Sequence, residues 1–210
     1  RDLYSAFDIR GDEDFFLASM GIYVFNRDGM LQLLDNNFTD FGKHIIPGAI
    51  TTHRVFSYVF QGYWEDIGTI RSFFEANLDL IQVDPLLNLY DMDWPIRTLQ
   101  PQFPPAKFVF ADPTTDRMGI AYDSIVTQGC IVSGGKVIRS VLSPNVRVNS
   151  FSRVDRCILF EGVSIGRRAR VQNAIIDKDV KVPEGMEIGF QDIFTFKQTG
   201  TDEKGAVKGH

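Results

Sequence analysis

The chain repeats one pattern four times, in DSIVTQGCIV (123–132), RSVLSPNVRV (139–148), RCILFEGVSI (156–165) and NAIIDKDVKV (173–182). The starts of these segments are almost evenly spaced along the chain. Each has a small residue in second place, two aliphatic residues after it and a turn-forming residue in seventh place. A further apolar column recurs with the same period, at Val137, Val154, Val171 and Ile188. Repetition with a fixed period predicts a solenoid, in which each repeat packs on its neighbours.

The spacing within each repeat favours β-strands. Apolar residues recur about every six positions as β-branched pairs, whereas helical repeats place them three and four residues apart. Three short strands in each coil predict a triangular parallel β-solenoid over residues 120–192. The turn formers in seventh place suit corners that need a positive φ. They are Gly129, Asn145, Gly162 and Asp179.

Composition places the chain among folded proteins. Of its 210 residues, 44% are hydrophobic and 23% are charged, which excludes the disordered and fibrous classes. The formal net charge of −5 gives no overall basic field that would attract nucleic acid or an anionic membrane. We see no apolar run as long as a membrane span and no export signal, so we expect a cytoplasmic protein. Because the sequence begins with Arg1 rather than Met, we also expect a piece of a longer chain.

The two cysteines, Cys130 and Cys157, lie in the apolar and small-residue columns of the repeat. They form neither a CxxC motif nor a cluster with histidine, which fits a reducing compartment and predicts no metal site at these residues. Free cysteines are among the most buried residue types. We therefore expect both thiols to be packing groups inside the solenoid.

Residues 1–81 show the pattern of a partial α/β layer. The apolar stretches 17–26 and 54–60 predict two strands of a buried sheet. Two or three strands with two or three helices are too few for a closed doubly wound domain. We therefore expect this sheet to need strands from elsewhere.

The helices of this layer are predicted from their periodicity. Residues 27–37 have apolar side chains on one side, and residues 69–81 place theirs near one face, with Thr69 as the N-cap. Between them, residues 40–50 predict a loop and a short helix broken by Pro47 and Gly48.

Residues 82–119 connect this layer to the repeats. They hold six of the nine prolines, yet they also carry large apolar side chains that need burial, so we expect an ordered connector. The side chains concerned are Leu86, Leu89, Tyr90, Trp94, Phe103, Phe108 and Phe110. Residues 193–210 are polar, and we expect this tail to fray.

Five motifs occur in one order before the repeats: ASMGIYVF (18–25), DFGKHIIP (40–47), YWEDIGTI (63–70), LYDMDWPI (89–96) and PPAKFV (104–109). Together they resemble the C-terminal half of the bacterial ADP-glucose pyrophosphorylases, the glucose-1-phosphate adenylyltransferase family. The coils resemble the hexapeptide-repeat family, which forms a left-handed parallel β-helix. The resemblance implies the end of a Rossmann-like nucleotidyltransferase domain over 1–81, a connector over 82–119, the β-helix over 120–192 and a tail over 193–210.

The same resemblance implies an activity. Members of the family join ATP and glucose 1-phosphate to give ADP-glucose and pyrophosphate in glycogen biosynthesis, with Mg²⁺ as the cofactor. It also implies a homotetramer that responds to a phosphorylated metabolite. The family's GGGxGTRL-like nucleotide loop and its FxEKP sugar-phosphate motif do not occur in the printed sequence. We therefore expect the chain to be inactive by itself.

The resemblance also implies roles for single residues. It assigns Asp66 to the catalytic Mg²⁺; the alternative is a surface acid that caps the helix beginning near Ile70. It assigns Ser19 to the glucose of glucose 1-phosphate and Gly21 to a close approach of the backbone. The alternatives are a strand-start serine and a bulge glycine. Trp64 either shapes the same pocket or is a buried aromatic residue that contacts no ligand.

Lys178 matches a family position near the allosteric effector site, where a cation would meet a phosphate. The alternative is a solvated charge, since Lys178 lies at a predicted corner of the solenoid between Asp177 and Asp179.

Two other functions stay open. One is a regulatory or catalytically silent subunit that acts through contacts of its β-helix in an oligomer. The other is a related transferase that uses UTP or GTP. Acyltransferases and trimeric carbonic anhydrases, which place essential histidines on such coils, are disfavoured, because the three histidines lie outside the coils. These histidines are His44, His53 and His210.

Overall fold

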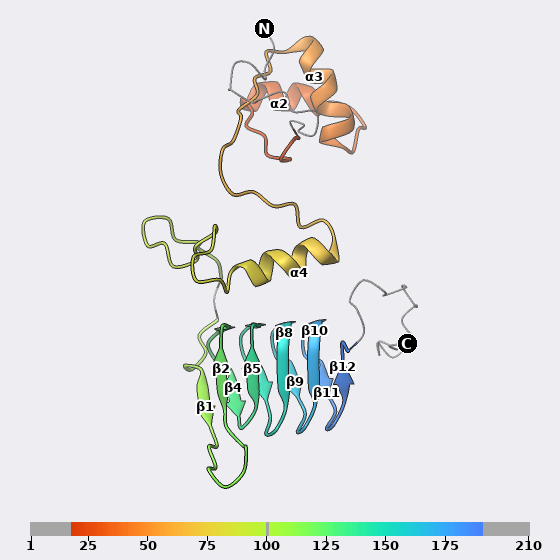
Figure 1. Ribbon diagram of the computed structural model, residues 1–210. Coiled ribbons are helices and arrows are strands. Elements are labelled where there is room, and N and C mark those ends of the chain that lie inside the picture. The colour runs from red at the N-terminus through yellow and green to blue at the C-terminus, as the bar shows by residue number, and fades with distance from the viewer. Residues whose placement is uncertain (1–17, 100, 191–210) are drawn as a thin grey trace, which may run out of the picture. The chain divides into compact units, whose positions relative to one another are not determined.

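A computed structural model describes residues 18–99 and 101–190 (Figure 1). It divides the chain into two compact units, Arg1–Gly62 and Tyr63–His210. We call these the first and the second unit and describe each by itself.

The described part of the first unit is helical. It contains α2 (Arg27–Leu33), the π-helical turn η1 (Phe41–Ile45) and α3 (Ile46–Thr52). The prediction that Pro47 and Gly48 break a helix is wrong, because α3 runs through both residues. Pro47 lies in the first turn of α3, where its missing N–H has no intrahelical partner to lose.

The two strands predicted in the first unit are not formed within its described residues. Neither 18–26 nor 54–60 is assigned to a strand, and side chains such as Val24 and Tyr58 are 98% and 88% exposed. A strand is stabilised by hydrogen bonds to a neighbouring strand, and residues 18–62 provide none. The apolar pattern is present, but the pattern alone does not form a sheet.

The second unit contains a parallel β-helix whose short strands stack coil upon coil (Figure 1). One sheet consists of β1 (Lys107–Val109), β4 (Ile131–Ser133), β7 (Arg147–Val148), β9 (Ser164–Ile165) and β11 (Lys181–Val182). The other consists of β2 (Ile120–Tyr122), β5 (Lys136–Ile138), β8 (Arg153–Leu159), β10 (Arg170–Ile176) and β12 (Glu187–Ile188), with β3 (Ile125–Val126) and β6 (Val141–Leu142). Every one of these pairings is parallel. The predicted solenoid is confirmed.

The register follows the sequence repeat. Val154 pairs with Val137 on one side and with Val171 on the other, and Val171 pairs with Ile188, so the recurring apolar column is one stack of side chains. The seventh-place turn formers have the positive φ expected of them, from 58° at Asp179 to 76° at Gly129. Side chains in the middle of the interior are completely buried, with Val154 and Leu159 at 0% exposure.

The paired aliphatic residues of each repeat point to opposite faces, because successive residues alternate along a strand. The second of each pair packs into the interior; these are Val126, Leu142, Leu159 and Ile176. The first of each pair forms an outer row of paired residues, Ile125, Val141, Ile158 and Ile175. We call this row the outer aliphatic stripe.

Helix α4 (Ile70–Asp79) covers part of the outer aliphatic stripe. Phe74 and Leu78 on α4 form a buried cluster with Ile158, which is only 1% exposed. The predicted helix over 69–81 is therefore confirmed, and so is Thr69 as its N-cap.

The connector differs from its prediction. Six of its seven large apolar residues are exposed, with Trp94 at 82% and Leu86 at 84%, and only Phe103 is half-buried. β1 lies within the stretch 82–119 and pairs with β4, so parallel pairing begins upstream of residue 120. No helix in the described part of the chain is long and apolar enough to cross a membrane.

Candidate functional site

Asp66 lies in a tight turn that its own side chain closes. Its Oδ1 accepts a hydrogen bond of 3.0 Å from the backbone N–H of Gly68. A Cβ on Gly68 would come within 3.1 Å of the same oxygen, so glycine keeps the turn free of crowding. The carboxylate is exposed to solvent. Asp66 is thus held at one oxygen within an exposed turn.

Asp66 does not cap α4, because Thr69 does. Thr69 Oγ1 accepts a 3.0 Å hydrogen bond from the N–H of Ser72, and Ser72 Oγ accepts one of 3.2 Å from the N–H of Thr69. This reciprocal pair is a capping box, which satisfies two backbone donors at the start of the helix. The capping interpretation of Asp66 is therefore wrong, and its turn is a separate element in front of the helix.

The Asp66 turn fits one ligand position of a hard cation. No hydrogen bond from another described residue reaches Oδ2. Mg²⁺ prefers oxygen ligands and is commonly held by one or two carboxylates together with substrate phosphates and water. Across residues 18–99 and 101–190, no three His, Cys, Asp or Glu side chains gather into a group that could hold a metal by themselves. The chemistry of the exposed Asp66 carboxylate is compatible with one oxygen ligand of such a cation.

Ser19 and Gly21 form a polar turn in the first unit. Ser19 Oγ accepts a 3.2 Å hydrogen bond from the N–H of Gly21 and lies 3.3 Å from the hydroxyl oxygen of Tyr23. Gly21 has a φ of 69°, a conformation that favours glycine, and the space where its Cβ would lie is open. A hydroxyl and an open stretch of backbone beside it are suited to binding a sugar. Since no strand forms over 18–26, the strand-start and bulge interpretations of these residues have no support.

Trp64 lies two residues before Asp66 and is 42% exposed. It is therefore not the buried aromatic residue of the alternative interpretation. The hollow beside the end of α4 is lined in part by Tyr63, Asp79 and Asp84. Partial burial and the charges of Asp79 and Glu65 raise the pKa of Tyr63. Two carboxylates in its lining make this hollow unsuitable for a nucleotide or a sugar phosphate.

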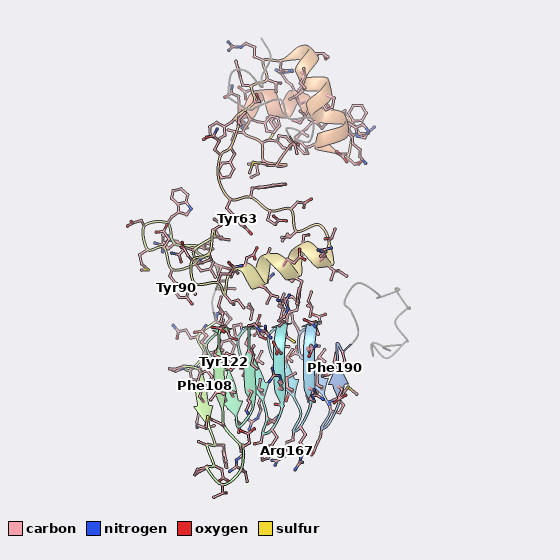
Figure 2. All side chains as sticks on the ribbon, viewed as in Figure 1. Tyr63, Tyr90, Phe108, Tyr122, Arg167 and Phe190 are labelled. Carbon is pink, nitrogen blue, oxygen red and sulfur yellow. The ribbon has the colours of Figure 1, made fainter. Side chains whose placement is uncertain are left out.

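Lys178 is exposed at a corner of the last coil. Its backbone N–H donates a 2.7 Å hydrogen bond to Asp177, and the next residue, Asp179, has a φ of 58°. Arg168 and Arg170, by contrast, are built into the contacts between coils. Each forms a 2.9 Å ion pair, with Glu184 and Glu187 respectively, and they lie over the rings of Phe151 and Phe190. Figure 2 labels Phe190, which follows the last strand of the β-helix.

The structure thus gathers the predicted site residues into three places. Trp64 lies two residues before the Asp66 turn of the second unit, Ser19 and Gly21 share one turn of the first unit, and Lys178 lies on the last coil. Both thiols are excluded as nucleophiles, because Cys130 and Cys157 are completely buried and burial raises the pKa of each.

One charged group was missed by the sequence analysis. Asp155 is buried in β8 and accepts hydrogen bonds of 2.7 Å from both Arg139 and Arg153. The signal was an acid within the strand sequence RVDRCIL, next to the small-residue column. The outer aliphatic stripe was also missed. Its signal was the pair of adjacent aliphatic residues in each repeat, because an alternating strand needs only one of the two to fill the interior.

Known proteins match both parts of the chain. Residues 12–83 match the family described as nucleotidyl transferase, and residues 104–207 match the GlmU-like C-terminal hexapeptide family. Glucose-1-phosphate adenylyltransferases from Koribacter versatilis and Rhodopirellula baltica are each 50% identical to the chain, over 186 and 193 residues. The enzyme of the same name from Paramagnetospirillum magneticum is 46% identical over 212 residues.

These alignments cover 82%, 85% and 93% of this chain. They cover 44%, 43% and 49% of the relatives, so the chain spans a little under half of their length. The matched stretch includes the Asp66 turn, helix α4 and all coils of the β-helix. The chain is therefore homologous to the glucose-1-phosphate adenylyltransferases, over a stretch that combines a nucleotidyl transferase segment with a hexapeptide β-helix.

Proposed function

We propose that this chain is part of a glucose-1-phosphate adenylyltransferase, which converts ATP and glucose 1-phosphate into ADP-glucose and pyrophosphate. One observation carries the proposal. The chain is 50% identical to an enzyme of that name over 186 residues, and its described part contains two exposed turns, the Ser19–Gly21 turn and the Asp66 turn. The exposed carboxylate, the exposed hydroxyl and the open glycine backbone would be suited to binding Mg²⁺ and a sugar in this reaction.

Each of the two turns would have one role in the reaction. An oxygen of the sugar phosphate attacks the α-phosphorus of ATP in line, and the bond to the leaving pyrophosphate breaks. Ser19 would hydrogen-bond the glucose, and the Gly21 backbone would let the sugar come close. Trp64 would border the sugar. Asp66 would hold Mg²⁺, which supplies neutralisation of phosphate charge.

We propose that the other residues of the site belong to a longer protein of which this chain is a part. The nucleotide loop and the FxEKP motif of the family do not occur in the printed sequence, so we propose that this chain alone makes no ADP-glucose. We further propose that the complete protein acts in the cytoplasm, in glycogen biosynthesis, as a homotetramer. These points are supported by the homology to the glucose-1-phosphate adenylyltransferases.

Pyrophosphate release by the complete natural protein tests this proposal. The protein is given glucose 1-phosphate and Mg²⁺ with ATP, UTP, GTP or dTTP in turn. We expect turnover with ATP and far less with the other three nucleotides. A preference for UTP or GTP would mean a related transferase, and no turnover with any nucleotide would mean a catalytically silent subunit.

Lys178 is proposed to contact a phosphate of the effector. Its exposure at a corner, without the glutamate partners that Arg168 and Arg170 have, supports this role. Replacing Lys178 by Gln in the complete protein should reduce stimulation by phosphorylated glycolytic intermediates. Lys181→Gln, an exposed lysine on β11, is the matched control and should leave the stimulation intact.

A further inference from the structure

The aliphatic side chains of the outer aliphatic stripe must be shielded from water by another part of the chain. Its four members pair in register along the outside of the β-helix, where aliphatic side chains would otherwise face water. The most buried of them is Ile158, at 1% exposure, and its neighbour Ile175 is half-buried. The residues that bury them lie on α4, far upstream in the sequence.

Helix α4 packs on the β-helix through three contacts. Phe74 and Leu78 pack with Ile158 in one buried cluster. The rings of Phe73 and Phe160 lie 6.1 Å apart at a tilt of 55°. The guanidinium of Arg156 lies 6.0 Å from the centre of the Phe74 ring. Aromatic pairs and cations over aromatic rings both favour such arrangements.

Helix α4 depends on these contacts. It has 10 residues, and isolated helices of fewer than about 12–15 residues are marginal in water. The capping box at Thr69 stabilises its first turn but buries no apolar surface. Most of the stability of α4 therefore comes from packing on the β-helix.

The Asp66 turn is joined directly to this helix. Gly68 donates to Asp66, and the next residue, Thr69, caps α4, so no flexible segment separates the carboxylate from the helix. We propose that the β-helix positions Asp66 through α4, with Phe74, Leu78 and Ile158 as the positioning residues. This inference rests on the proposed function in so far as Asp66 acts in catalysis.

Two isoleucines allow a matched test in the complete protein. Ile158→Ala removes the contact with α4, whereas Ile165→Ala removes a side chain of equal size from the interior, where Ile165 is 0% exposed. The valine variants at both positions serve as milder versions if either alanine variant fails to fold. Phe74→Leu weakens the same contact from the helix side.

Hydrogen exchange is the first measurement, and it does not depend on activity. We expect the amides of residues 68–78 to exchange roughly tenfold faster in Ile158→Ala than in Ile165→Ala. Phe74→Leu should have the same effect, and combining it with Ile158→Ala should add little, because both changes disrupt one contact. Equal exchange of these amides in the two isoleucine variants would overturn the inference.

Dependence on Mg²⁺ is the second measurement. In Ile158→Ala, the Mg²⁺ concentration that gives half-maximal ADP-glucose synthesis should rise roughly fivefold, as expected when a ligand is less well positioned. Ile165→Ala, which only lowers the amount of folded protein, should leave that concentration unchanged. The same value in both variants would overturn a positioning role. Absence of turnover in the unmodified protein would contradict the proposed function instead, and hydrogen exchange would still report on α4.

Discussion

The β-helix and the first unit contrast in how they use apolar residues. Along the β-helix, apolar side chains such as Val132, Leu142 and Val163 are completely buried. In the described part of the first unit, only Ile45 and Ala49 are buried, while residues such as Val24 and Phe56 are exposed. Both regions are rich in apolar residues. The difference lies in whether the region contains its own packing partners.

A repeat provides those partners in its own sequence. Each coil of the β-helix offers the next coil a strand with the same register and the same apolar column. The apolar stretches 18–26 and 54–60 have no such copy of themselves nearby in the chain. The β-helix is therefore stabilised by local repetition, whereas the described residues of the first unit contain no repeated partner for these apolar stretches.

The largest expected loss of stability follows from replacing a buried leucine of the β-helix, and an exposed leucine of the first unit serves as the comparison. Leu159→Ala in the β-helix should lower the free energy of unfolding by about 3 kcal/mol, because it leaves a cavity among completely buried side chains. Leu31→Ala, at a residue that is 52% exposed on α2, should change it by less than about 0.5 kcal/mol. Urea unfolding of each variant measures both values. Similar losses at the two positions would contradict the contrast between the regions.

A smaller loss of stability is expected when the buried charge of Asp155 in the β-helix is removed. Asp155→Asn should cost about 2 kcal/mol, because charged hydrogen bonds from Arg139 and Arg153 are weakened inside the structure. The matched control is Asp116→Asn, which breaks an ion pair with Lys136 at a side chain that is 88% exposed. That change should cost less than about 1 kcal/mol. Urea unfolding that gives equal costs for both variants would show that burial of Asp155 has no energetic consequence.

The smallest expected effect at neutral pH is on the reactivity of the two thiols in the β-helix. Burial raises the pKa of Cys157 to about 12 from its usual 9.0 and also raises that of Cys130. At pH 8 we therefore expect iodoacetamide to modify neither thiol in the folded chain and both in urea, as read by mass spectrometry.

The Cys157 thiol should make stability depend on pH only above the pKa that this thiol has in the unfolded chain. Below 9.0 the thiol is protonated in both states, so its contribution is fully present there. Between 9.0 and about 12 the unfolded chain loses the proton first, so stability is lost as the pH rises through that range. Cys157→Ala should make this alkaline loss shallower, and an unchanged pH dependence would show that the Cys157 thiol is not buried in solution.

The contrast between the regions also explains what the sequence could predict. The repeat predicted the coils, their register and the positive φ of corner residues such as Gly129, because all partners lie within the repeat. Thr69 and helix α4 were predicted from a local cap and a local period. The burial of Ile158 by Phe74 was not predicted, because it joins segments that are far apart in the sequence.

The candidate site was predicted less completely than the fold. Motifs indicated Asp66, Ser19 and Gly21, and the structure places each of them in an exposed turn closed by its own hydrogen bonds. The sequence placed Asp66 just before a helix but did not indicate that this helix packs on the β-helix. That arrangement depends on the outer aliphatic stripe, whose meaning becomes clear only once the in-and-out alternation of each strand is known.

Two neighbouring carboxylates provide the most direct test of the functional account. In the complete protein, Asp66→Asn should lower the rate of ADP-glucose synthesis by at least roughly a hundredfold, the scale on which losing one charge-stabilising group acts. Glu65→Gln, the adjacent exposed acid, should retain most of the activity. That pair of results is what the account predicts. Full activity in Asp66→Asn, or equal losses in both variants, would contradict the assignment of the Asp66 turn to the catalytic site.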